Sequence, residues 1–99
     1  MKKGAIFINT SRGPIVEEAA LIAAIRDGRI VAALDVFDTE PLPANNPFRT
    51  LPNTVLTPHL GFTTVEGLAA FYQPALSNIL AFLDGKPVNL MNPDVMKKS

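Results

Sequence analysis

The sequence has no cysteine and only one histidine, His59, among its 99 residues. Without cysteine, the chain cannot form a disulfide scaffold, offer a thiolate nucleophile or bind a metal through sulfur. A single imidazole also excludes a multi-histidine metal site within one chain. We therefore expect no metal ion in the function of this chain.

Excess charge is lacking as well, because nine basic residues offset nine acidic ones. Nucleic acids and anionic membranes attract clustered positive charge, so we expect neither as a partner. The longest apolar run, residues 19–25, has seven residues, whereas a membrane span needs roughly 18. The N-terminal apolar stretch ends after Ile8, too soon for a signal peptide. We therefore expect a cytoplasmic protein.

The rest of the composition is typical of a packed globular chain, with 47% hydrophobic and 18% charged residues. Residues 5–8 form an apolar run without alternation, which predicts a strand buried on both faces of a parallel sheet. A helix is predicted over residues 17–25, with Gly28 as its left-handed end, and a second strand over residues 30–36. Strand, helix and strand within about 30 residues form a βαβ unit, so we expect an α/β fold.

Five of the nine prolines lie between residues 37 and 58. Proline fixes φ and lacks an N–H, so this stretch is predicted to be an irregular loop. A brief third strand is expected over residues 54–57. Long irregular segments inside compact domains are uncommon and often functional.

The T-x-x-E pattern that begins at Thr63 has the spacing of a helix capping box. Apolar residues at three- and four-residue spacing follow it and predict a long helix over residues 63–84. Pro74 lies inside this stripe and is expected to kink the helix or split it. Residues 85–99 form a tail.

Residue types suited to chemistry follow the predicted strands, where parallel sheets bind their ligands. The first strand leads to Arg12, the second to Asp35 and the third to His59. Glu40 lies on the loop that leaves the second strand. Three strand ends are therefore predicted to bring a guanidinium, carboxylates and an imidazole to one edge of the sheet.

Each of these residues also has a purely structural interpretation. Arg12 is compatible with a surface residue that bonds loop carbonyls, and Asp35 with the cap of a turn. Glu40 is compatible with a solvated loop, and His59 with an ordinary buried histidine. Only their joint placement favours a functional site.

Three motifs resemble those of the D-isomer-specific 2-hydroxyacid dehydrogenases: residues 9–13 (NTSRG), residues 34–41 (LDVFDTEP) and residues 57–61 (TPHLG). They occur in the family's order, with 28 residues from Arg12 to Glu40 and 19 from Glu40 to His59. The resemblance covers residues 1 to about 93. It implies the later half of a nucleotide-binding domain: a partial Rossmann-like parallel sheet of about three strands, with a crossover helix and a long C-terminal helix.

The resemblance implies an oxidoreductase that transfers hydride between NAD(P) and a 2-hydroxy or 2-keto acid. Arg12 matches the residue that binds the substrate carboxylate, for which a planar guanidinium is suited. His59 matches the general acid/base. An imidazole suits this role because its unperturbed pKa lies near neutrality. Glu40 matches the carboxylate that orients this ring.

The resemblance also assigns cofactor contacts, with NAD or NADP as the cofactor. Asp35 matches the position that holds the nicotinamide carboxamide. The other residues implied to line the cofactor are Thr10, Ser11, Arg12, His59, Gly61 and Phe62.

The chain departs from the family pattern in several ways. No G-x-G-x-x-G turn occurs in it, although this turn binds the cofactor pyrophosphate. Phe62 stands where a second glycine is frequent after the histidine motif. We expect residues 1–99 to be a single incomplete nucleotide-binding domain with a bare sheet face and edge, whose tail returns to a substrate domain in a full-length protein. Alone it should bind NAD poorly and turn over little; a homo-oligomer or a complementing N-terminal half are the expected partners.

Two other interpretations remain open from the sequence. The chain is also compatible with a non-catalytic remnant of the fold that serves as an oligomerisation or partner-binding module. A hydrolase that uses Ser11, His59 and Asp35 is weaker, because Ser11 lacks the G-x-S-x-G elbow of such enzymes.

Overall fold

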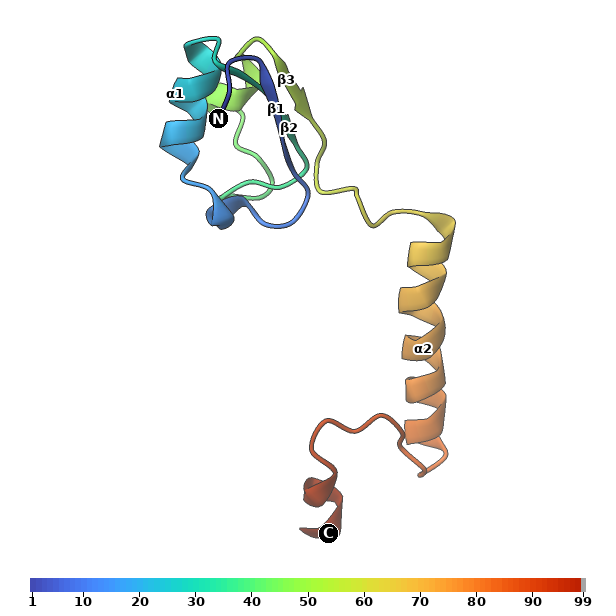
Figure 1. Cartoon of the computed structure of the whole chain (residues 1–99). Helices are drawn as coiled ribbons and strands as arrows, with labels where there is room; N and C mark the ends of the chain where they lie inside the picture. The colour runs from blue at the N-terminus through green and yellow to red at the C-terminus, as the bar shows by residue number, and fades with distance from the viewer. Residues whose placement is uncertain (99) are drawn as a thin grey trace. The chain divides into compact units, whose positions relative to one another are not determined.

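The computed structural model describes residues 1–98, which divide into two compact units (Figure 1). The first unit is Met1–Gly61, and the second begins at Phe62. All predicted strands and the first predicted helix lie in the first unit, together with every predicted site residue except Phe62. The expectation that residues 1–99 form one nucleotide-binding domain stays a prediction.

A three-stranded parallel sheet is the framework of the first unit. Its strands β1 (Ala5–Asn9), β2 (Ile30–Leu34) and β3 (Thr54–Leu56) lie in the order β1-β2-β3. The helix α1 (Glu18–Arg26) connects β1 to β2 and lies beside the sheet (Figure 1). Gly28 follows it with a φ of 66°, the left-handed conformation expected where the helix ends. The predicted α/β, partial Rossmann-like fold is confirmed.

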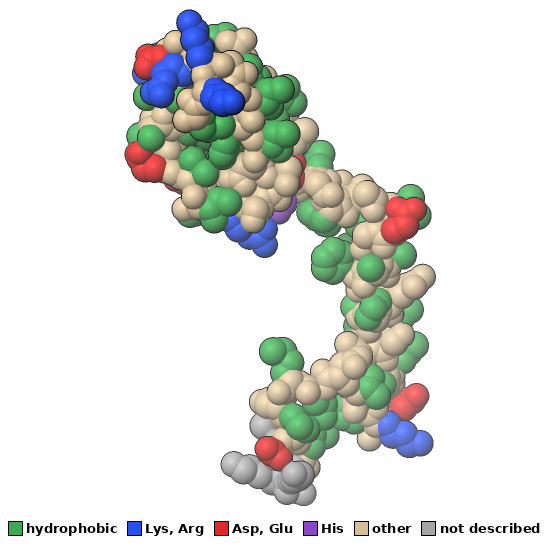
Figure 2. All heavy atoms as spheres, in the orientation of Figure 1, with side chains coloured by type: hydrophobic (Ala, Val, Ile, Leu, Met, Phe, Trp, Pro, Cys, Tyr) green, Lys and Arg blue, Asp and Glu red, His purple; other side chains and the backbone are tan. Residues whose placement is uncertain are grey.

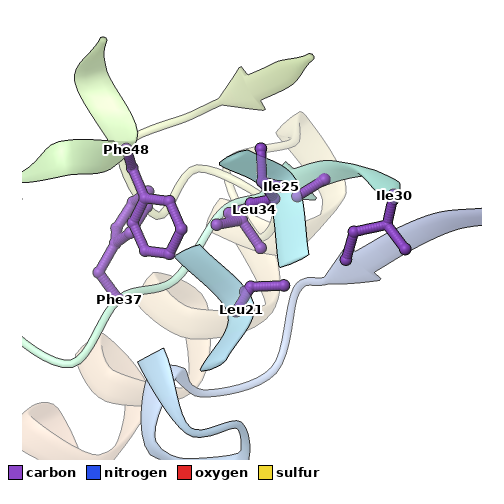
Figure 3. Packing of buried hydrophobic residues seen from close by; sticks show 7 residues of the cluster. Leu21, Ile25, Ile30, Leu34, Phe37 and Phe48 are labelled. Atoms are coloured by element: carbon purple, nitrogen blue, oxygen red, sulfur yellow. The ribbon is translucent and has the colours of Figure 1, made fainter. Parts of the chain in front are cut away.

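The core of this unit lies between α1 and one face of the sheet. Figure 3 shows Leu21 and Ile25 of α1 directed toward Ile30 and Leu34 of β2. Ile25 has no exposed surface, and full burial of such a side chain contributes about 1.5–3 kcal/mol. The helix therefore holds the sheet through a small cluster of aliphatic contacts.

The proline-rich segment adds an aromatic pair to this core. Phe48 lies on the short helix η2 (Pro47–Arg49), and its ring packs 6.1 Å from that of Phe37. Asn46 caps η2, since its side chain accepts a hydrogen bond from the N–H of Phe48, and it also bonds Glu18 at the start of α1. The irregular loop is thus tied to the core.

The second face of the sheet is bare within this unit, which corrects the expectation that β1 is buried on both faces. Ile6 and Ile8 are 67% and 65% exposed, and Val55 of β3 is 62% exposed. The physical reason is that α1, the one α-helix of Met1–Gly61, covers the opposite face. The expectation of a bare sheet face agrees with this exposure.

The helix α2 (Val65–Leu83) dominates the second unit, against an expected 63–84. Its N-cap is Thr64, whose side chain accepts a hydrogen bond from the N–H of Gly67 at 2.9 Å. The N-cap therefore lies one residue after the predicted Thr63, and Gly67 at the third helical position has no side chain to complete a capping box. The helix also continues through Pro74 and is not split there, because a proline removes only one backbone hydrogen bond from a long ladder.

Exposed apolar side chains lie along α2, as Figure 2 shows for one side of the helix. The exposed members of the predicted stripe are Leu68, Phe71, Tyr72, Leu76, Ile79, Leu80 and Leu83. Phe62 packs edge-on against Phe71, with ring centroids 6.1 Å apart. After α2, the described chain ends in the short helix η3 (Pro93–Lys98). No helix within residues 1–98 is long and apolar enough to cross a membrane.

Candidate active site

The candidate site lies where the three strands of the first unit end. Backbone hydrogen bonds extend the ladder beyond the strands: the N–H of Asp35 donates to the carbonyl of Asn9, and that of Thr57 to the carbonyl of Leu34, each at 3.0 Å. The segments that carry Arg12, Asp35 and His59 therefore leave the sheet side by side. This is the arrangement that the strand pattern predicted.

His59 and Glu40 form a direct pair in this site. The imidazole Nδ1 lies 2.6 Å from Oε2 of Glu40, while Oε1 of Glu40 accepts a hydrogen bond from the N–H of Phe37 at 2.9 Å. Both carboxylate oxygens are thus engaged, and the ring has a fixed partner. The hydrogen bond from His59, followed by that from Phe37, lowers the pKa of Glu40 below its ordinary value of 4.5.

Asp35 is a buried carboxylate, only 5% exposed, at the centre of a hydrogen-bond network. Its Oδ1 accepts from the hydroxyl of Thr57 and from the N–H of Leu60, and its Oδ2 accepts from the N–H of Gly61. The bond from Thr57 contributes most to lowering the pKa of Asp35 below 3.8, followed by the bond from Leu60. The network therefore keeps a negative charge beside the histidine loop.

These lowered values predict acid sensitivity. A pKa that is lower in the folded chain means that the unfolded chain binds more protons, so the stabilisation is present above the ordinary values of 3.8 for Asp35 and 4.5 for Glu40. It should be lost as the pH falls through the lower folded-state values. Thermal unfolding midpoints measured from about pH 6 to about pH 3 should drop steeply for the wild-type chain. The drop should be shallower for Glu40→Gln; equal slopes would contradict the prediction.

Arg12 lies in a turn that Asn9 holds. The buried Asn9 side chain donates to the carbonyl of Arg12 at 2.9 Å and accepts from the N–H of Ser11 at 3.1 Å. The guanidinium of Arg12 is exposed and bonds the carbonyl of Ser11 at 2.6 Å. Its positive charge is a minor contribution to the low pKa of Glu40.

The remaining predicted cofactor residues are placed differently. Thr10 and Ser11 are exposed on the turn after β1. Gly61 contacts Asp35 so closely that an added Cβ would lie 3.1 Å from Oδ2. Phe62 belongs to the second unit, and its contact with the cofactor stays a prediction.

A cavity of about 530 Å³ lies beside the acid–base pair. Its lining residues are Phe37, Glu40, Pro41, Leu42, Arg49, Leu56, Thr57, Pro58 and His59. The wall is mostly apolar, and the guanidinium of Arg49 bonds the carbonyls of Leu42 and Pro43 at 2.6 and 2.9 Å. Such a hollow suits a small organic ligand next to the imidazole.

Sequence reasoning did not assign roles to Asn9, Thr57 and Arg49. Asn9 was the one detectable case, because a polar residue that directly ends a buried strand needs a partner. Thr57 lies opposite Asp35 because the two residues extend the parallel register that pairs Leu34 with Leu56. Arg49 bonds carbonyls only six and seven residues earlier in the loop, and the sequence pattern alone does not show this contact. The carboxylate on Nδ1 of His59 is Glu40, not the Asp35 that the hydrolase interpretation requires.

Chemically, the arrangement offers an imidazole with a carboxylate orienter, and a guanidinium nearby. This set can exchange a proton with a bound oxygen while a cation attracts a negatively charged substrate. It requires no nucleophile from the protein.

Residues 1–61 match the family model of the D-isomer specific 2-hydroxyacid dehydrogenase, NAD binding domain. The chain is 49% identical over 100 residues to glyoxylate/hydroxypyruvate reductase B of Serratia proteamaculans, covering 99% of this chain and 31% of that protein. It is 46% identical over 99 residues to glyoxylate reductase of Thermofilum pendens, covering 98% of this chain and 29% of that protein. The chain thus spans about a third of the length of these curated relatives.

A solved structure of the same family is similar to this chain. The D-isomer specific 2-hydroxyacid dehydrogenase from Xanthobacter autotrophicus Py2, in complex with NADPH and MES, superposes with a TM-score of 0.64 at 46% identity. The match covers 90% of this chain and 36% of that one. The similarity therefore extends over most of this chain.

Proposed function

The chain belongs to the D-isomer specific 2-hydroxyacid dehydrogenase family, and from this premise we propose that it provides the acid–base machinery for reducing a small 2-keto acid. The observation that carries the proposal is the contact of 2.6 Å between His59 Nδ1 and Glu40, next to the turn that bears Arg12. An oriented imidazole beside a guanidinium suits a substrate that has both a carbonyl and a carboxylate.

Each side chain has a defined task in this proposal. Arg12 binds the substrate carboxylate, for which its exposed guanidinium must exchange the bond to Ser11 for the ligand. His59 gives a proton to the keto oxygen during reduction and takes the alcohol proton in the reverse reaction. Glu40 stabilises the protonated ring, and its low pKa keeps it charged for this purpose.

The cofactor of this domain family is NAD or NADP. When bound, it supplies the hydride that reduces the substrate. A carboxylate has about four acceptor positions, and Asp35 uses three of them within the chain. Asp35 can therefore accept one more hydrogen bond, from the carboxamide of the nicotinamide. Thr10 and Ser11, on the adjacent turn, would line the cofactor. The pyrophosphate has no glycine-rich turn among these 99 residues, so we propose that a complementing half provides it.

A chimera tests this proposal. In it, the present chain replaces the matching 100 residues of the Serratia relative. The chimera should oxidise NAD(P)H with glyoxylate or hydroxypyruvate, the substrates in that relative's name, while the 99-residue chain alone should bind NAD weakly and turn over little. Arg12→Gln in the chimera should raise KM for the keto acid about a hundredfold, because a charge-assisted bidentate contact is lost.

The main alternative is a non-catalytic module that binds a partner or a second copy. The exposed apolar side chains Ile6, Ile8 and Val55 and those along α2 favour it. A folded chimera that binds NADH but reduces no keto acid would support this alternative and contradict the acid–base proposal.

A further inference from the structure

The backbone of His59 has an unusual conformation. Its φ is 57°, in the left-handed region that residues other than glycine seldom adopt. Such a conformation costs free energy and persists only where surrounding contacts hold it. The contact between Nδ1 and Glu40 depends on it, because the backbone sets the direction in which the ring leaves the loop.

The two residues after His59 are anchored to one carboxylate. The N–H groups of Leu60 and Gly61 donate to Oδ1 and Oδ2 of Asp35, each at 2.8 Å. Asp35 is itself buried and bonded to Asn9 of β1 through its own N–H. The loop after the histidine is therefore fixed to the sheet, and not only to its own strand.

The residue two positions before His59 is anchored to the same group. The hydroxyl of Thr57 donates to Oδ1 of Asp35, the oxygen that also accepts from Leu60. Bonds on both sides of His59 thus meet at one oxygen atom. This closes a short loop over residues 57–60, which leaves its backbone few alternatives.

We propose that Thr57 is a positioning residue: through Asp35, its hydroxyl keeps the His59 backbone left-handed and its ring against Glu40. Asp35 then has a second role besides the cofactor contact inferred from family resemblance. The inference rests on the proposed function only in that His59 is the acid/base. Its structural content concerns the free chain and is testable without turnover.

The test is NMR on the 99-residue chain, in which His59 is the only histidine and its ring signals are unambiguous. Thr57→Val removes the hydroxyl at nearly constant volume. Amide exchange at Leu60 and Gly61 should accelerate about tenfold, because the carboxylate loses the donor that orients it. The downfield signal of the Nδ1 proton should shift or disappear, and Thr57→Ser should restore both readouts.

Thr54→Val is the matched control. Thr54 begins β3, the strand that Thr57 directly follows, and its hydroxyl bonds the carbonyls of Leu51 and Phe48, away from Asp35. This variant should leave the Leu60 exchange rate and the His59 ring signal unchanged. Equal changes in both variants, or no change in Thr57→Val, would overturn the inference.

A second measurement needs no variant and covers the case in which Thr57→Val does not fold. In the wild-type chain, scalar coupling across the hydrogen bonds should connect the amide nitrogens of Leu60 and Gly61 to the carboxyl carbon of Asp35. Absence of both couplings would contradict the inference. A chimera that stays inactive while these couplings are present would instead contradict the proposed function and leave the positioning role intact.

Discussion

His59→Asn in the chimera should reduce kcat for keto-acid reduction about a thousandfold, since a positioned general acid contributes about 10²–10⁴. Asparagine retains a polar side chain of similar reach but cannot exchange a proton near neutral pH. KM should change little, because Arg12 and not His59 is proposed to bind the substrate carboxylate. Steady-state kinetics with NADH and glyoxylate would measure both parameters.

Glu40→Gln separates the orienter from the acid. Glutamine can still accept a hydrogen bond from Nδ1 of His59, but it lacks the charge that stabilises the protonated ring. We expect a smaller loss of kcat than for His59→Asn. Glu17→Gln serves as the control, because Glu17 precedes α1 and forms no side-chain cap there.

If His59→Asn keeps more than about a tenth of the wild-type kcat, His59 is not the general acid.

The strands and helices were predictable because their signals are local. Ala5–Asn9 and Ile30–Leu34 are short apolar runs bounded by polar or glycine residues, and α1 is rich in alanine. The prediction that β1 is buried on both faces was wrong. An apolar run shows that both faces of a strand are able to pack against other elements, but only one face of the sheet has a helix in this unit. The N-cap is Thr64 and not the predicted Thr63. Adjacent threonines have the same hydroxyl group, so the sequence does not distinguish between them.

The site shows a different limit of sequence reasoning. Parallel strands predict that Arg12, Asp35 and His59 approach one another, since their positions follow from topology alone. The hydrogen-bond partners of these residues do not follow from topology alone. Two sets of contacts depend on how the proline-rich loop folds. Asp35 accepts hydrogen bonds from the amides after His59, and Glu40 bonds both His59 and Phe37. Family resemblance supplied Glu40 as a partner, but neither pattern nor resemblance indicated Thr57.

Gly13→Ala should cause the largest loss of stability among single substitutions at the glycines. Gly13 is buried, and a Cβ there would lie 2.1 Å from the carbonyl carbon of Phe37, 2.3 Å from its oxygen and 2.5 Å from the nitrogen of Asp38. All three atoms are backbone, so no side chain can rotate away. The turn after Arg12 would have to separate from the segment that leads to Glu40.

We expect Gly13→Ala to lower the free energy of unfolding by about 3 kcal/mol or more, at the upper end of overpacking costs. The control is Gly28→Ala, where φ is 66° and no atom lies within 4 Å of the added Cβ. It should cost only about 1–2 kcal/mol from its left-handed backbone. Urea unfolding of the three chains measures the difference. A Gly13→Ala chain as stable as Gly28→Ala would contradict the close backbone contact of Gly13 with Phe37 and Asp38.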